Sequence, residues 1–160
     1  WGGSSKGISF INDQKSFKKK KFREETLIEE VVVGKELTVT VIKDNQSIKA
    51  LGVTEIEFNS HHYDYKAKYT KGRSKHYLPA RISNKQYEFL INISKKIFSV
   101  CNCRSLARID FILSKKNGKI YFLELNTHPG LTKISLAPEQ ATFKKLKYHH
   151  LLEKIIASSL

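Results

Sequence analysis

The chain has 160 residues, enough for one ordinary domain, and its hydrophobic content of 40% excludes a disordered tail. Lysine and arginine outnumber aspartate and glutamate by 29 to 15, and the net charge of +14 favours anionic partners such as nucleotide phosphates, nucleic acid or an acidic membrane surface. No apolar run approaches the length of a membrane span and no signal-peptide pattern opens the chain, so we expect no membrane partner.

Cysteine and histidine usage argues against a disulfide framework and against zinc. Cys101 and Cys103 are one residue apart, too close for either a routine disulfide or a zinc knuckle, so we expect a reduced, cytoplasmic setting. The six histidines show no zinc-ligand spacing. Methionine is absent, even from position 1, where Trp1 stands. We therefore expect a processed or truncated piece of a longer protein.

The first third of the chain predicts a glycine-rich loop, a short helix and strands. Residues 2–7 form a small-residue loop that could bring backbone N–H groups to phosphates, although such a loop is more often a plain turn. Asn12 or Asp13 can cap a basic helix through Lys21, whose four consecutive lysines are more often a solvated face than a nucleic-acid patch. Three strands are then expected, with a turn at Gly34 after the first: residues 27–31, 37–42 and 48–56.

The middle of the chain predicts a functional loop followed by helices. Residues 59–77 show no apolar period, as is typical of a functional or a disordered loop. Ser83 and Gln86 form a capping box that opens a helix with an apolar stripe, and Cys103 should lie buried between this helix and the hairpin that follows. A last helix is predicted over residues 143–157.

The most informative stretch is a predicted hairpin over residues 107–126, with its turn at Asn117-Gly118. On the first strand Arg108 and Asp110 alternate with apolar residues. On the second strand a strict alternation places four residues on one face, namely Ile120, Phe122, Glu124 and Asn126. An ordinary solvated face with a salt bridge would explain a lone Asp and Glu, but oxygen ligands on rigid strands also suit a hard cation such as magnesium.

Several short motifs then occur in a familiar order. Residues 107–111 read Ala-Arg-Ile-Asp-Phe, residues 123–130 read Leu-Glu-Leu-Asn-Thr-x-Pro-Gly, and residues 132–136 read Thr-x-x-Ser-Leu. Together they resemble the carboxy-terminal signature of the D-alanine–D-alanine ligases, in the ATP-grasp superfamily. Upstream stretches are also similar to family motifs: Gly-Ser-Ser-x-Gly at 3–7, Ile-Glu-x-x-x-x-Gly-x-Glu-Leu-Thr-Val at 28–39, and Tyr-Asp-Tyr-x-x-Lys-Tyr at 63–69. Lys6 departs from the family, where this position is usually apolar.

The resemblance implies an α+β fold, an antiparallel sheet with helices on one face. Residues 1–33 would end the central ATP-grasp lobe, and residues 34–160 would form the carboxy-terminal catalytic lobe. The implied reaction uses ATP to activate one D-alanine as an acyl phosphate, which a second D-alanine attacks to give the dipeptide for peptidoglycan. A D-lactate-using synthetase is the other possibility within the family, although Tyr69 looks more like the D-alanine enzymes.

The resemblance also assigns roles to individual residues. Two Mg²⁺ ions, or Mn²⁺ in their place, would bind to Asp110, Glu124 and Asn126. ATP would be bound by Ser5, Glu29, Val32, Glu36, Lys68 and Leu123. The catalytic residues would be Ser4, Tyr69, Arg108, Gly130 and Ser135, with Arg108 and the Gly130 N–H stabilising the tetrahedral oxyanion. The carboxylate of the second substrate would be received by Ser135 and Leu136.

In the family, an amino-terminal domain supplies a glutamate that orients the first D-alanine and lysines that contact ATP, and this chain has no counterpart of either. It is therefore expected to be a fragment of a working ligase, a degenerate remnant without activity, or a basic nucleotide- or nucleic-acid-binding module. The first two are favoured, because the metal and lid motifs are retained. A homodimer or association with the missing amino-terminal part would be possible. Because lysines occur in several elements, no nucleic-acid partner is expected.

The hairpin turn yields a prediction of its own. A two-residue Asn117-Gly118 turn would place Asp110 and Glu124 on opposite faces, where they could not share metal ions. The familiar ligases have one residue fewer between these two acids. We therefore predict a loop of odd length or a bulge, with Gly118 in the left-handed conformation, so that both carboxylates share one face.

Overall fold

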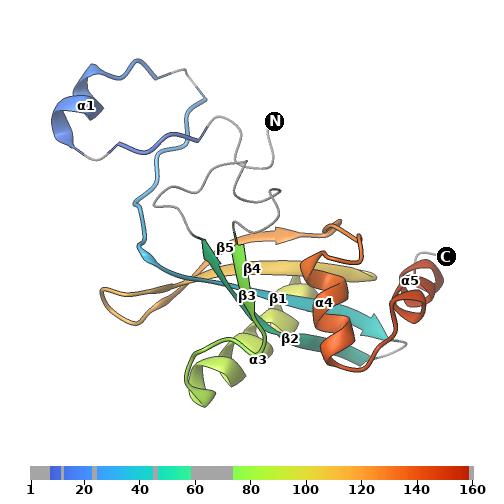
Figure 1. The fold of residues 1–160 in the computed structure, drawn as a ribbon. Helices are drawn as coiled ribbons and strands as arrows, with labels where there is room; N and C mark the ends of the chain where they lie inside the picture. Colours follow the sequence, from blue (N-terminus) through green and yellow to red (C-terminus); the bar gives the residue numbers. More distant parts are fainter. Residues whose placement is uncertain (1–7, 12, 23–24, 45–46, 59–73, 159–160) are drawn as a thin grey trace.

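The computed structural model describes the whole chain except residues 1–7, 12, 23–24, 45–46, 59–73 and 159–160. In the described part, five strands form one antiparallel sheet in the order β3-β2-β1-β4-β5 (Figure 1). The strands are β1 (Gly34–Asp44), β2 (Ser47–Phe58), β3 (Ser74–Tyr77), β4 (Leu106–Ser114) and β5 (Ile120–Asn126). The predicted α+β class and antiparallel sheet are confirmed.

Helices cover both faces of this sheet. Along β1, Leu37, Val39 and Val41 point to one face, where they join the apolar core under α3 (Asn84–Val100). Ile42 points to the opposite face and packs with α4 (Leu136–Phe143) and α5 (Tyr148–Ala157). The expectation of helices on one face was wrong. Residues 37–42 bury side chains on both faces of β1, and each apolar face of a sheet needs helices packed against it.

β1 begins at Gly34, where the sequence predicts a turn. A Cβ at Gly34 would lie 2.2 Å from the backbone oxygen of Leu113 on β4, so only glycine allows this close approach. The strand predicted over residues 27–31 is absent: these residues carry no regular structure, and Leu27 is 81% exposed. Their apolar, β-branched composition suits a strand, but none of the described strands pairs with them, and an unpaired strand is not stable.

The helices confirm most of the capping predictions. α1 (Gln14–Lys19) is capped by the Asp13 side chain, which accepts from Ser16 N, and Figure 1 shows it apart from the sheet. Ser83 and Gln86 form the predicted capping box of α3. The helix predicted over residues 143–157 is α5, which begins at Tyr148, and α4 before it was not predicted. The backbone of Lys145 has a φ of +60°, which separates them, because a helix cannot continue through a left-handed residue.

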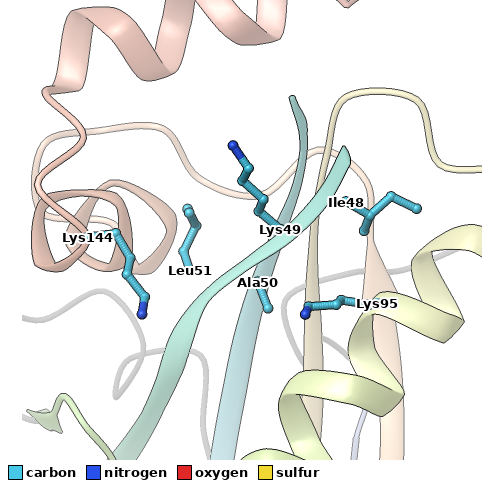
Figure 2. Close-up of a pocket in the computed structure, with 6 residues that line it drawn as sticks. All are labelled: Ile48, Lys49, Ala50, Leu51, Lys95 and Lys144. Atoms are coloured by element: carbon cyan, nitrogen blue, oxygen red, sulfur yellow. The ribbon is translucent and has the colours of Figure 1, made fainter. Parts of the chain in front are cut away.

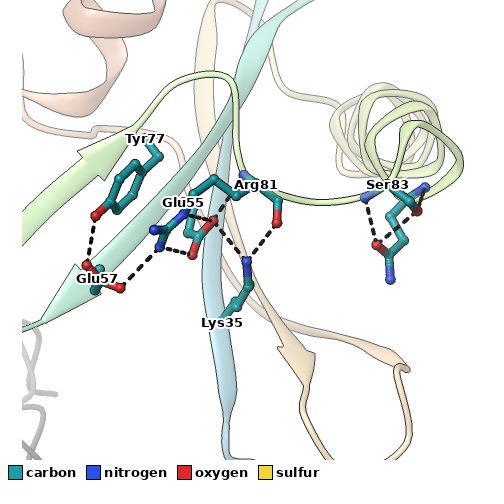
Figure 3. Close-up of polar contacts among 7 residues, drawn as sticks. Lys35, Glu55, Glu57, Tyr77, Arg81 and Ser83 are labelled. Carbon is teal, nitrogen blue, oxygen red and sulfur yellow. Dashed lines mark hydrogen bonds and ion pairs between the residues drawn. The ribbon is translucent and has the colours of Figure 1, made fainter.

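A buried carboxylate ties the start of α3 to the sheet (Figure 3). Glu55 on β2 accepts hydrogen bonds from the Arg81 backbone N at 3.0 Å, from its Nε at 3.1 Å, and from Nη2 at 2.7 Å. Lys35 Nζ on β1 lies 3.3 Å from the same carboxylate. Burial raises the pKa of Glu55, but these donors outweigh burial and hold the pKa below its ordinary value. The carboxylate therefore stays charged and joins β1, β2 and the segment before α3.

The cysteines and the helices bear on two further expectations. Cys103 packs against the core beside α3 but is only partly buried, whereas the prediction had it buried, and this partial burial raises the pKa of its thiol. Among the described residues, no helix is both long and apolar enough to cross a bilayer.

Candidate functional site

The register of β4 and β5 places the two predicted metal-binding acids face to face. Arg108 pairs with Asn126, and Asp110 pairs directly with Glu124. Directly opposed residues of an antiparallel pair project to the same face, so these four side chains line one surface. It is the face of the sheet opposite α3, because the neighbours Ile109 and Phe111 point into the α3 core.

A bulge produces this register. Between Ser114 and Lys119 the chain makes a four-residue loop with Gly118 at a φ of +65°, rather than a two-residue turn. From that loop the ladder pairs Phe111 with Phe122, but the next pair is Asp110 with Glu124, so Leu123 is the extra residue. The prediction of a bulge and of carboxylates on one face is confirmed.

The same bulge corrects the face assignment of β5. The strict alternation put Ile120 and Phe122 on the face of Glu124 and Asn126, and this was wrong. Ile120 pairs with Leu113 and packs against the α3 core, and Phe122 meets the ring of Phe111 edge-on at 6.1 Å. The extra residue inverts the alternation, because side chains on the two sides of a bulge are out of phase by one position.

Asp110 is held in place by its neighbours on the sheet. Its Oδ1 accepts from Thr38 Oγ1 at 2.6 Å and from Arg108 Nε at 2.9 Å, and its Oδ2 accepts from Arg108 Nη2 at 2.8 Å. The same Arg108 nitrogen lies 3.6 Å from Glu124 Oε1. The Asp110 side chain is 19% exposed and that of Glu124 is 57% exposed. Two carboxylates therefore converge on an open surface with one guanidinium between them.

This donor set suits magnesium in its chemistry. Asp110, Glu124 and Asn126 offer only oxygen ligands on one surface, which is the preference of a hard cation. Asn126 Oδ1 accepts from His128 N at 2.9 Å, which fixes the amide orientation. Among the described residues, no group of three or more His, Cys, Asp or Glu side chains could hold a metal ion. An ion here would thus rest on two carboxylates and an amide, leaving positions for phosphate oxygens.

The loop after β5 brings the predicted substrate residues together. Ser135 Oγ lies 2.9 Å from where a Gly130 Cβ would stand and 2.8 Å from Thr132 Oγ1. Ser135 is the N-cap residue of α4, but its side chain makes no capping hydrogen bond. The first N–H groups of α4, beginning at Leu136, therefore face the same loop without a side-chain cap, a position that suits a carboxylate.

The remaining predicted residues are only partly placed. Glu36 lies on β1 two residues before Thr38, on the same face as Asp110. Glu29 is exposed and Val32 half-buried in the irregular segment before β1, and Leu123 is the exposed bulge residue. Ser4, Ser5, Lys68 and Tyr69 lie outside the described residues.

Sequence reasoning missed two side chains that support the site. Thr38 bonds to Asp110, and the polar alternation of Thr38 and Thr40 in an otherwise apolar strand was an available signal. Gln140 on α4 is fully buried and bonds to three different residues of the sheet. No signal in the sequence distinguishes Gln140 from an ordinary surface glutamine.

A shallow recess lies elsewhere, at the outer side of β2 (Figure 2). Its lining includes Lys49, Lys95 and Lys144, from β2, α3 and the end of α4, over an apolar floor that includes Ala50. Lys49 is paired with Asp44 at 2.7 Å. The recess contains none of the predicted site residues, so the candidate site is the open surface of β4 and β5 and not this hollow.

The family follows from a comparison over almost the whole chain. The family model described as "D-ala D-ala ligase C-terminus" matches residues 1–157. The chain belongs to this ligase family. Curated relatives named D-alanine–D-alanine ligase include those of Rickettsia canadensis, 38% identical, and Rickettsia massiliae, 40% identical, each matched over 98% of this chain. The chain spans about half the length of these relatives, 45% and 49% respectively.

Solved structures of ligases share the fold. The chain is similar to the VanG D-Ala:D-Ser ligase of Enterococcus faecalis, with a TM-score of 0.67 and 30% identity over 82% of this chain and 38% of that one. It is also similar to the D-alanine–D-alanine ligase of Bacillus anthracis complexed with ATP, with a TM-score of 0.64 and 26% identity over 82% of this chain and 41% of that one. The predicted family and fold are confirmed, whereas the division at residue 33 and the residue roles stay predictions.

Proposed function

We propose that this chain supplies the metal-, nucleotide- and acceptor-binding wall of an ATP-dependent ligase that joins two D-alanines through an acyl phosphate, for peptidoglycan precursor synthesis. The observation that carries the proposal is the direct pairing of Asp110 with Glu124 beside Arg108 and Asn126. Like charges directly opposed on a strand pair destabilise it unless a cation lies between them. Arg108 offsets part of this repulsion, and Mg²⁺ would offset the rest.

The residues would divide the work as follows. Asp110, Glu124 and Asn126 would hold Mg²⁺, which neutralises phosphate charge when bound. Arg108, oriented by its two bonds to Asp110, and the Gly130 N–H would bind the oxyanion of the tetrahedral intermediate. Ser135 and the first N–H groups of α4 would receive the carboxylate of the second D-alanine, placing its amine towards the acyl phosphate. Glu36 would bind the ribose hydroxyls of ATP.

Binding of Mn²⁺ in the presence of ATP tests the proposal on the 160-residue chain. Electron paramagnetic resonance should show ATP-dependent Mn²⁺ binding that Mg²⁺ displaces. Asp110→Asn and Glu124→Gln should each weaken it by roughly 10- to 100-fold, because each removes an ionic ligand at an otherwise preserved position. Glu57→Gln, in an exposed carboxylate on the other face of the sheet, is the matched control and should change nothing. Mn²⁺ binding that is absent, or unaffected by both site variants, would favour a degenerate remnant.

Dipeptide synthesis by the chain alone is a separate matter. The relatives are about twice as long, and substrate positioning contributes roughly 10⁵- to 10⁸-fold to rate. We therefore expect no D-alanyl-D-alanine from ATP and D-alanine with the 160-residue protein, measured by coupled phosphate release and chromatography of the product. Steady dipeptide formation would show that this wall of the site suffices.

A further inference from the structure

The polar side chain of Gln140 joins α4 to β1 and β2 by three directional bonds. Gln140 is fully buried. Its Oε1 accepts from the Thr40 backbone N at 2.8 Å. Its Nε2 donates to the Thr38 backbone O at 3.0 Å and to Thr54 Oγ1 at 2.9 Å. Both amide hydrogens and the amide oxygen are thus used, which fixes the side chain in position and rotation.

These bonds fall where the sheet is irregular. The register of β1 with β2 shifts between Thr40 and Val41, opposite Gly52. Leu51 is the extra residue of β2 at this shift, and on β1 the Thr40 backbone N–H, next to the shift, donates to Gln140 Oε1. The glutamine side chain therefore bonds to β1 at the residue next to this irregularity.

The same part of β1 also holds Asp110. The hydroxyl of Thr38 donates to Asp110 Oδ1, while the backbone oxygen of Thr38 accepts from Gln140. α4 and Asp110 are therefore both bonded to Thr38. The apolar contacts of α4 are non-directional, and its buried Ala137 and Ala141 are small, so these contacts alone allow the helix to rotate or slide. Glu139 on α4 also contacts His76 Nδ1 on β3 at 3.2 Å, but both side chains are partly exposed, and an exposed contact of this kind holds a helix less firmly than the buried bonds of Gln140.

We propose that Gln140 is a positioning residue that sets where the start of α4, with Ser135 and Leu136, stands relative to Asp110 and Glu124. It sets the distance between the acceptor carboxylate and the metal-bound phosphates. This catalytic consequence rests on the proposed function, whereas the orientation of α4 does not.

Residual dipolar couplings of the metal-free 160-residue chain test the orientation directly. Gln140→Met keeps the length of the side chain and removes its hydrogen bonds. It should change the fitted orientation of α4 relative to β1 and β4 and leave the couplings within the sheet unchanged. Thr142→Val is the matched control, because it removes a hydrogen bond to Pro138 O within α4, and it should leave the orientation as in the parent. An unchanged α4 orientation in folded Gln140→Met would overturn the proposal.

A second variant and a second readout keep the result decisive. If Gln140→Met does not fold, Gln140→Glu retains the acceptor for Thr40 N–H and loses the donors. An unmoved α4 in that variant overturns the proposal.

Bound Mn²⁺–ATP should broaden the amide signals of Asn126, Ser135 and Leu136 in the parent. The Gln140 variants should change the broadening at 135 and 136 but not at 126. Absence of broadening at all three in the parent counts against the proposed function, while the dipolar couplings still decide the role of Gln140.

Discussion

Two arginine–carboxylate clusters lie on opposite faces of the same sheet and differ in how they are closed. Around Glu55, with a side chain only 4% exposed, Arg81 and Lys35 fill the acceptor positions of a single carboxylate. Around Asp110, one guanidinium stands before two carboxylates, and the second of them, Glu124, is 57% exposed. A carboxylate whose acceptor positions are filled by protein donors stabilises the fold, whereas two carboxylates that share one guanidinium can still bind a further cation.

The largest expected effect follows from removing the closed cluster. Glu55→Gln should lower the free energy of unfolding by about 2 kcal/mol, because it leaves the cationic groups of Arg81 and Lys35 facing a neutral amide. Mn²⁺–ATP binding by the folded fraction should not change. Guanidinium unfolding followed by circular dichroism measures the free energy of unfolding.

Asp110→Asn should show the reverse pattern, with a stability change within about 1 kcal/mol and weakened Mn²⁺ binding. Identical patterns in the two variants would abolish the distinction between the clusters.

The pH dependence of stability should distinguish the parent chain from Glu55→Gln. The pKa of Glu55 is lowered from 4.5 in the folded chain, so its stabilising contribution is complete above about pH 4.5 and is lost as the pH falls through the folded-state pKa. The parent should therefore lose more stability than Glu55→Gln as the pH falls below about 4.5. Other carboxylates also titrate in this range, including Asp44, whose pKa is lowered by Lys154 and Lys49, so the difference between the two proteins is the informative quantity. Parallel pH profiles would contradict the role of Glu55.

The smallest expected effect concerns the helix that follows the closed cluster. Ser83→Ala removes the side chain that accepts from Gln86 N and should cost about 1 kcal/mol of stability. It should leave Mn²⁺–ATP binding unchanged, because α3 covers the face opposite Asp110. Ser99→Ala, near the exposed end of the same helix, provides the comparison and should cost less than about 0.5 kcal/mol. A binding defect in Ser83→Ala would mean that the two faces are coupled through the sheet.

Local chemistry made much of the fold predictable. The capping box at Ser83 and the alternation in β4 depend on neighbours a few residues apart, and both were read correctly. The segment 27–31 was misjudged because its strand pattern has no partner among the described strands, which no local rule can show. α4 was not predicted, since its helical residues follow a Pro-Gly loop and its stripe is made of small residues such as Ala137 and Ala141.

In the candidate site, too, features set by near neighbours in the chain could be predicted, and features set by distant partners could not. The shared face of Asp110 and Glu124 could be predicted, because an odd residue in a hairpin must be absorbed by its loop or by a bulge. Where the bulge would fall could not be read from the sequence, and so Ile120 and Phe122 were assigned to the wrong face. Gln140 was beyond reach, because its partners on β1 and β2 are 86 to 102 positions away in the chain.

The bulge at Leu123 also bears on how β5 is aligned with a strand that lacks a bulge. A gap of one residue would ordinarily be assigned to the tip of the hairpin, at Asn117-Gly118, where insertions are tolerated. The register of this hairpin instead places its unpaired residue inside β5, three residues before Asn126. An alignment with the gap at the tip would therefore equate residues 119–123 with the wrong neighbours. Comparative studies of substitution tolerance along β5 should see the positions that face α3 change from even to odd numbers as they pass Leu123.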